Sequence, residues 1–429
     1  MHLIKVILLF FVVFNFPIPI IYNSSFLAIL IASIVYLLYP ALLSTLVSTL
    51  RNKYTVRLIC VFVTLILFGL IPGFLHFTFD FSIIKPYVLT FFLILCSCYI
   101  YPILIYDKEY EDRFLTILLL LITIFFLQSL IEIAALTTPA VKNIVEFFQK
   151  EAVSSKDMGG IRALGLTGNP FFDLAAGFGL IFIVFFYYII HQRSKDFFSF
   201  INVLLFIILF IGSFFAGRTA FVGLGAAVCF YFMSFGNRLQ KIANFGKLLL
   251  IILSFSFLLY TFLLPDNLKE IVENQLLPYA FEFVYSYLDT GSVSTESGDV
   301  LEQMYFPISW ETFFLGDGHY TGADGAYYRH TDSGIMRNVL FYGIFGLILI
   351  LFGHLFYFFK PFQIVLSELR KRCRFEDLNL GLFFITILGY TLVLQYKGEV
   401  LLFMPIIQTM LFFVCYSFVE NNKQLINKQ

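Results

Sequence analysis

The chain has 429 residues, of which 60% are hydrophobic and 13% are charged, and its 28 Lys and Arg balance its 28 Asp and Glu. A soluble globular protein is nearer a quarter charged, so this composition excludes that class. The formal net charge of zero says nothing about partners by itself, and no nucleic-acid partner is expected.

Apolar runs of about 20 residues follow one another along the sequence, and each is long enough to cross the hydrocarbon core of a bilayer. Backbone polar groups in lipid must be satisfied internally, so such runs predict membrane helices. The first run ends in "PIPIIYNSS" without a small-residue cleavage pattern, and we interpret it as a retained span instead of a signal peptide. Twelve spans are predicted, at 3–22, 25–47, 58–76, 88–106, 114–136, 171–190, 197–216, 219–235, 248–264, 338–359, 378–396 and 400–419.

Lys and Arg gather in alternate connections between these spans, and this bias marks the cytoplasmic side. Most of them lie in the segments "RNKYTVR", "DKEYEDR", "HQRSKD", "GNRLQKIANFGK" and "KPFQIVLSELRKRCRFED". Both termini are therefore expected in the cytoplasm, and the two long loops, 137–170 and 265–337, on the outer face. We expect residues 1–429 to form one integral membrane domain, an all-α polytopic bundle whose large outer loop is itself helical.

The sequence gives no pattern for a metal site. None of the six cysteines has a CxxC or Cys/His spacing, so neither disulfides nor zinc are suggested. Asp317 and Asp324 lie in "DGHYTGADG", which does not follow an EF-hand pattern. No metal and no cofactor are therefore expected.

Three cations stand in predicted outer connections. Arg218 lies in "FFAGRTAFVGLG" between two apolar runs, where its side chain either snorkels to lipid headgroups or holds a phosphate or carboxylate in its planar fork. Arg162, in "GGIRALGLTGNPFF", is either a solvated loop residue or the second half of such an anion clamp. Lys397, in "LQYKGEVLLFM", either pairs with Glu399 or faces the same outer cavity.

A further group of titratable residues precedes the tenth predicted span, in "YYRHTDSGIMRN". His330 and Asp332 stand two residues apart, and a histidine near neutral pH can take a proton from a hydroxyl while a carboxylate orients it. Arg337 follows them and would lie one turn along from Ser333 on a helix that begins there. The alternative is an ordinary polar loop.

These titratable side chains lie outside the predicted spans. A proton-coupled transporter, in contrast, often keeps a relay of Asp, Glu or His residues inside its spans. The exception is Glu132 in "SLIEIAAL", close to the outer end of the fifth predicted span. We infer a site at the outer leaflet for an anionic, lipid-linked ligand, and not a path through the membrane.

Several motifs resemble O-antigen polymerases of the Wzy type, which are related to the O-antigen ligases. "HTDSGIMRNVLFYGIFGLILIL" looks like their aspartate-serine-glycine motif and the span that follows it, and "FLGDGHY" resembles the turn before that motif. "AGRTAFVGL" is similar to an arginine-bearing turn of both families, "RALGLTGNPFFDLAAGFGL" to their arginine and Asn-Pro segment, and "YKGEVL" to a lysine-containing turn. These motifs cover about the C-terminal two thirds of the chain.

The resemblance implies an all-helical bundle like that of the C-type glycosyltransferases and a metal-independent, inverting transfer. Arg162 and Arg218 would hold the pyrophosphate of an undecaprenyl-diphosphate-linked donor. His330, with Asp332 beside it, would be the base that acts on the acceptor hydroxyl, and Arg337 and Lys397 would assist with phosphate or sugar. Such an enzyme would lie in the bacterial inner membrane with its site facing the periplasm, and a chain-length regulator is a possible protein partner.

The motif "HTDSG" favours a polymerase, because the ligases tend to have "HNxxL" at this place. One departure from the family is Asp299 in "STESGDVLE", where members often have an arginine. A ligase with another acceptor, and a flippase or transporter of the lipid-linked oligosaccharide, are the alternatives.

Overall fold

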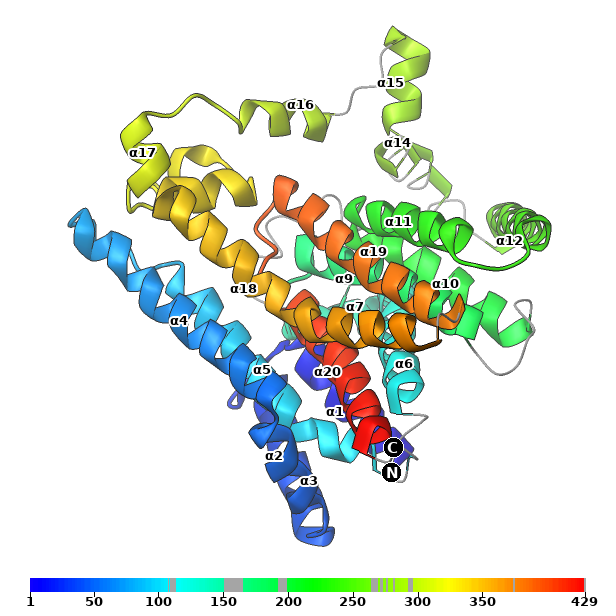
Figure 1. Ribbon diagram of the computed structural model, residues 1–429. Helices are drawn as coiled ribbons and strands as arrows, with labels where there is room; N and C mark the ends of the chain where they lie inside the picture. The colour runs from blue at the N-terminus through cyan, green and yellow to red at the C-terminus, as the bar shows by residue number, and fades with distance from the viewer. Residues whose placement is uncertain are drawn as a thin grey trace.

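The computed structural model describes residues 1–106, 108, 113–149, 165–191, 199–263, 269–270, 273–274, 277–280, 282–291, 296–372 and 375–427. In these residues the chain is all-α apart from one two-stranded hairpin (Figure 1). The long helices are α4 (Lys53–Leu75), α5 (Ile84–Leu104), α6 (Arg113–Thr137), α9 (Phe172–His191), α12 (Arg238–Leu258), α18 (Gly334–Arg372), α19 (Phe375–Lys397) and α20 (Pro405–Asn427). The shorter elements are α1 (His2–Phe14), β1 (Pro17–Ile18), β2 (Tyr22–Asn23), α2 (Ser24–Leu38), α3 (Leu42–Arg51), α7 (Pro139–Phe147), α10 (Phe200–Ala216), α11 (Thr219–Met233), η2 (Leu259–Leu263), α14 (Leu277–Ala280), α15 (Glu282–Thr290), α16 (Glu296–Gln303), α17 (Trp310–Leu315) and η4 (Tyr328–His330).

Six of the described helices, α4, α5, α6, α9, α18 and α19, are long and apolar enough to cross a membrane. Four shorter apolar helices, α1, α2, α10 and α11, lie at other predicted spans. The chain therefore has the helical character predicted for a membrane protein, while the number of twelve crossings stays a prediction.

The first two predicted spans differ from the structure. Residues 3–22 do not form one helix, because α1 ends at Phe14 and Asn15 adopts a left-handed conformation with φ of 39° before the β1–β2 hairpin. The predicted span 25–47 is divided into α2 and α3 at Pro40, where a proline disfavours helical backbone in the residue before it. At about 1.5 Å per residue, α1 alone is shorter than the hydrocarbon core.

Helix α9 lies at the centre of the bundle and is almost wholly buried. It packs against α6, α10, α11, α19 and α20. Its contact with α11 is a close backbone approach, because a Cβ on Gly223 would lie 2.1 Å from the Cα of Gly179. These two glycines let the helices pack without side chains between them, as small residues do in membrane bundles.

The connections between helices contact one another in two groups. In one group, Thr78 Oγ1 donates to the carbonyl of Gly318 at 2.7 Å, so the α4–α5 connection binds the segment after α17. In the other, Arg113 forms an ion pair with Glu420 at 3.2 Å, close to the starts of α1 and α6 and the end of α20. Figure 1 shows α17 at the end of the bundle opposite the two chain termini. The predicted alternation of the connections, and which face lies outside, stay predictions.

Gly343 interrupts α18 where the chain leaving α17 crosses it. Its φ is 71°, and a Cβ at this position would lie 2.2 Å from the carbonyl oxygen of Phe314. Gly316 approaches from the other side, since its own Cβ would lie 2.4 Å from the carbonyl oxygen of Phe341. The two glycines therefore allow backbone to lie on backbone, and this crossing places the segment 316–333 over the start of α18.

Replacing Gly343 with alanine is expected to destabilise the fold by about 1–3 kcal/mol, because a side chain would meet both a left-handed backbone and a crossing chain. The measurement is the melting temperature of the purified protein in detergent. Gly389→Ala is the matched control, since this glycine lies within α19 and, apart from the backbone of its own helix and its chain neighbours, nothing lies within 4 Å of its would-be Cβ. Equal melting temperatures of the two variants would show that the crossing does not depend on Gly343.

Candidate functional site

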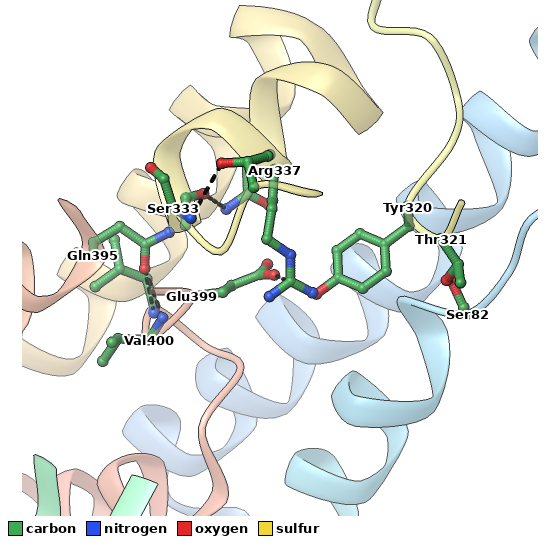
Figure 2. A network of polar contacts seen from close by, with 12 residues as sticks. Ser82, Tyr320, Thr321, Ser333, Arg337, Gln395, Glu399 and Val400 are labelled. Carbon is green, nitrogen blue, oxygen red and sulfur yellow. Dashed lines mark hydrogen bonds and ion pairs between the residues drawn. The ribbon is translucent and has the colours of Figure 1, made fainter. Parts of the chain in front are cut away.

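Three stretches of the chain that are distant in sequence meet at the end of the bundle that carries α17. They are the α4–α5 connection, the segment 316–333 with the first turns of α18 that follow it, and the turn 398–404 between α19 and α20. Figure 2 shows this cluster, with Arg337 between Glu399 and Tyr320. We refer to Arg337, Glu399, Tyr320 and Tyr327 as the Arg337 cluster.

Arg337 lies in the first turns of α18 and is only 6% exposed. Its guanidinium carbon is 4.2 Å from the ring centre of Tyr320 and 3.6 Å from that of Tyr327, so the cation lies against two aromatic faces. Phe403 contributes a third ring at 5.7 Å. Nε and Nη2 have no hydrogen-bond acceptor among the described residues. A buried arginine with donors to spare can accept an anion.

Glu399 is the acidic partner of Arg337. Its buried Oε2 lies 3.6 Å from Arg337 Nη2 and accepts a hydrogen bond from the hydroxyl of Tyr320. Burial raises the pKa of the Glu399 carboxyl to about 7, although Arg337, Asn338 and Tyr87 each lower it. The carboxyl therefore changes charge near neutral pH. The 3.6 Å between Glu399 Oε2 and Arg337 Nη2 is longer than a hydrogen bond. Charge and ring faces hold the arginine, not a bidentate clamp.

The turn that carries Glu399 is fixed by its neighbours. Gln395 Oε1 accepts hydrogen bonds from the backbone N–H groups of Val400 and Leu401, at 2.8 and 2.9 Å (Figure 2). Gly334 packs against this turn so closely that a Cβ there would lie 2.5 Å from the carbonyl oxygen of Gly398. The glycine of the "HTDSG" motif thus lets the start of α18 and the 398–404 turn meet, which brings Arg337 and Glu399 together.

The segment before α18 is tied to the end of α19 through tyrosines. Ser333 Oγ accepts from the backbone N–H of Met336 at 3.3 Å, as at a helix start, and donates to the hydroxyl of Tyr305 at 2.7 Å. Tyr305 in turn donates to the carbonyl of Tyr396 at 2.7 Å, and the two rings stack with centres 4.6 Å apart. The serine of "HTDSG" therefore starts the helix and anchors the large loop.

The α4–α5 connection holds the other side of the same segment. Asp80 Oδ2 accepts hydrogen bonds from the backbone N–H groups of Tyr320 and Thr321, at 2.7 and 2.8 Å. Thr321 also donates from its hydroxyl to Ser82 at 2.8 Å (Figure 2). These bonds fix the backbone on one side of Tyr320, whose ring lies on the guanidinium of Arg337.

His330 lies near this cluster but outside it. Its side chain is 76% exposed, and its Nε2 lies 3.5 Å from Asp324 Oδ2. The carboxylate that the structure places beside this histidine is therefore that of Asp324 and not that of Asp332. The Asp332 backbone N–H points to the sulfur of Met304 at 3.4 Å, and its side chain is close enough to Tyr327 to raise the pKa of that hydroxyl, behind the larger effect of burial.

The other residues that the sequence predicts to bind the substrate lie as follows. Arg218 immediately precedes α11 and forms an ion pair with Glu282 on α15, with both side chains partly exposed. Lys397 ends α19, half-buried and two residues before Glu399. Arg162 lies outside the described residues. The structure therefore brings the segments of Arg337, Lys397, His330 and Asp332 to one end of the bundle.

Glu399, Tyr320, Tyr327 and Asp80 are absent from the predicted site. In the sequence Glu399 has Lys397 as its obvious partner, because the two are close in one short turn. The structure instead pairs it with Arg337 from another helix. The sequence signal for Glu399 is an acidic residue in an apolar stretch. Such a residue predicts a charged or polar partner but does not identify it.

A second polar group is buried within the bundle on α6. Gln128 and Glu132 are both 0% exposed, one helical turn apart, and their side chains face each other. Gly165 covers them, since a Cβ there would lie 2.4 Å from Gln128 Nε2 and 2.9 Å from Glu132 Oε1. Gly165 is the first described residue of the segment before α9, and Gln128 and Glu132 lie beneath it. Among the described residues no contact joins this pair to the Arg337 cluster.

No protein-family model and no curated protein sequence matches this chain. The function is therefore argued from the chemistry of the Arg337 cluster and from the motifs of the sequence. Among the described residues no group of three or more His, Cys, Asp or Glu side chains could hold a metal ion.

Proposed function

We propose that the protein is a polysaccharide polymerase of the bacterial inner membrane, which acts on undecaprenyl-diphosphate-linked repeat units at the outer face. It would transfer the growing glycan from its lipid diphosphate to the non-reducing end of a new lipid-linked unit. The observation that supports this proposal is the buried guanidinium of Arg337, with donors that have no described acceptor, at the end of a membrane-type bundle.

A diphosphate leaving group gains negative charge as the glycosidic bond breaks, and fixed cations lower the energy of that state. The Tyr320 ring and the fixed 398–404 turn hold Arg337 in position, so the guanidinium itself needs no rearrangement to act. Lys397 and, from other segments, Arg162 and Arg218 would supply further positive charge. The acceptor hydroxyl must lose a proton, and the exposed imidazole of His330 is the proposed base.

Access to Arg337 would require the Tyr327 ring to move aside. This ring lies 3.6 Å from the guanidinium, yet Tyr327 itself is 44% exposed. It belongs to a small turn in which Thr321 and Tyr327 form a bridge, and Asp80 binds the Thr321 end of that turn. A phosphate could therefore replace one ring face while the Tyr320 face stays in place.

The test is the surface glycan pattern of a strain that lacks the gene. A polymerase defect leaves single repeat units attached at the surface, because ligation and flipping still occur. Loss of all repeat units from the surface would contradict the proposal and would indicate a ligase or a flippase. Complementation with the wild-type gene restores the ladder of chain lengths and serves as the control.

Replacing His330 with alanine is expected to lower the polymerisation rate about 10²–10⁴-fold with little change in KM, because a general base acts mainly in the transition state. The rate is measured with purified enzyme and extracted lipid-linked repeat units. His319→Ala is the matched control, since His319 lies in the same segment and stacks on Tyr328. Unchanged rates in both His330→Ala and the double variant with Asp332→Ala would remove these two residues from the mechanism.

A further inference from the structure

Glu399 has an unusual position for an acid in an anion site. It lies at the Arg337 guanidinium, in the place where a bound phosphate would compete with it for the same positive charge. The titratable and polar groups that face it come from three elements: Arg337, Asn338 and Tyr342 on α18, Tyr87 on α5, and Tyr320 and Tyr327 on the segment 316–333. Arg337 is the only cation among them.

The carboxyl group cannot easily move away when an anion arrives. Glu399 is buried, and the backbone that follows it is fixed by the two hydrogen bonds to Gln395. Gly334 lies against the Cα of Glu399, since a Cβ on the glycine would be 2.7 Å from it. Two anionic groups would then share one guanidinium in a site with little water, and like charges in such a site do not both stay ionised.

We propose that Glu399 takes up a proton when a diphosphate binds to Arg337, and that the resulting carboxylic acid donates a hydrogen bond to a phosphate oxygen. This inference rests on the proposed function, because it assumes that Arg337 holds the diphosphate of the lipid-linked unit. It assigns Glu399 to ligand binding, and it makes the affinity for the donor depend on pH through one named group.

The direction of the pH dependence follows from the two states of Glu399. Without ligand its pKa is about 7, and an anion beside it raises this pKa further. Well below pH 7 the carboxyl is already protonated, so binding takes up no proton and is tightest. As the pH rises from about 7 to the pKa of the bound state, the affinity falls by up to tenfold per pH unit.

The test measures binding of a farnesyl diphosphate ester of N-acetylglucosamine to the full-length protein in lipid nanodiscs between pH 6 and pH 9. Both phosphates of this probe are esterified, so its own charge is constant over the range. Wild type is expected to bind at least tenfold more weakly at pH 8.5 than at pH 6.5. Glu399→Gln is expected to bind with the same affinity at both values, and Glu311→Gln, on α17, should behave as wild type.

Proton uptake on the wild type is measured independently, by titration calorimetry in buffers of different ionisation enthalpy. Near pH 7.5 we expect an uptake of up to about three quarters of a proton for each bound probe, because about a quarter of Glu399 is already protonated without ligand. This result does not depend on whether Glu399→Gln folds. Tight binding without pH dependence or proton uptake would overturn the inference and leave the proposed function intact. Absence of binding to the wild type at every pH would instead count against the Arg337 site itself.

Discussion

Replacing Arg337 with alanine is expected to abolish polymer and to lower the free energy of unfolding by about 3–5 kcal/mol, because it leaves Glu399 buried without its cation. Loss of polymer alone would therefore not distinguish an unstable protein from an inactive one. The double variant Arg337→Ala with Glu399→Gln removes both charges and should recover most of the stability. Surface glycan length and the melting temperature in detergent are the two measurements.

The expected pattern is a stable double variant that still displays only single repeat units. Arg337→Lys keeps the charge but loses the planar fork and the stacking on Tyr320 and Tyr327, and we expect at least a tenfold loss of activity. Arg329→Ala is the matched control, because Arg329 is partly exposed and pairs with Asp317 outside the cluster. Polymer of normal length from the stable double variant would exclude Arg337 from donor binding.

The apolar runs predict the helices well where nothing interrupts them. The runs at 58–76, 114–136 and 171–190 correspond to α4, α6 and α9 within a few residues. The prediction fails where apolar residues continue through a break in the helix, as after Phe14 and at Pro40. Hydropathy measures only partition into lipid, so an apolar hairpin or turn has the same signal as a helix.

The site is harder to predict than the helices because its contacts are distant in sequence. The motif "HTDSG" indicates a site near the start of α18, and its serine and glycine indeed make the contacts that position Arg337. The motif does not show that Glu399 and Tyr320 close around that arginine, since this depends on the 398–404 turn and on the chain crossing at Gly343. In the sequence, His330 and Asp332 stand two residues apart, as do Lys397 and Glu399, and this spacing favours those pairs instead.

Replacing Arg218 with alanine is expected to leave only single repeat units at the cell surface, as is Arg162→Ala, if these residues hold the donor diphosphate. For Arg218 the structure offers a second role, because its guanidinium pairs with Glu282 and so ties α15 to the start of α11. The two roles predict different results for a change in Glu282, and this difference makes the test specific.

Under the ligand-binding role, Glu282→Gln removes a competitor for the Arg218 guanidinium, so polymer is kept and affinity for the glycosyl diphosphate probe is equal or higher. Under the purely structural role, Arg218→Ala and Glu282→Ala remove the same ion pair, so each shortens the polymer equally and the double variant adds nothing further. Glycan length for these four variants, with probe binding in nanodiscs, separates these outcomes. Equal defects in Arg218→Ala, Glu282→Ala and the double variant would withdraw Arg218 from the donor site and leave Arg337 and Lys397 as its described cations.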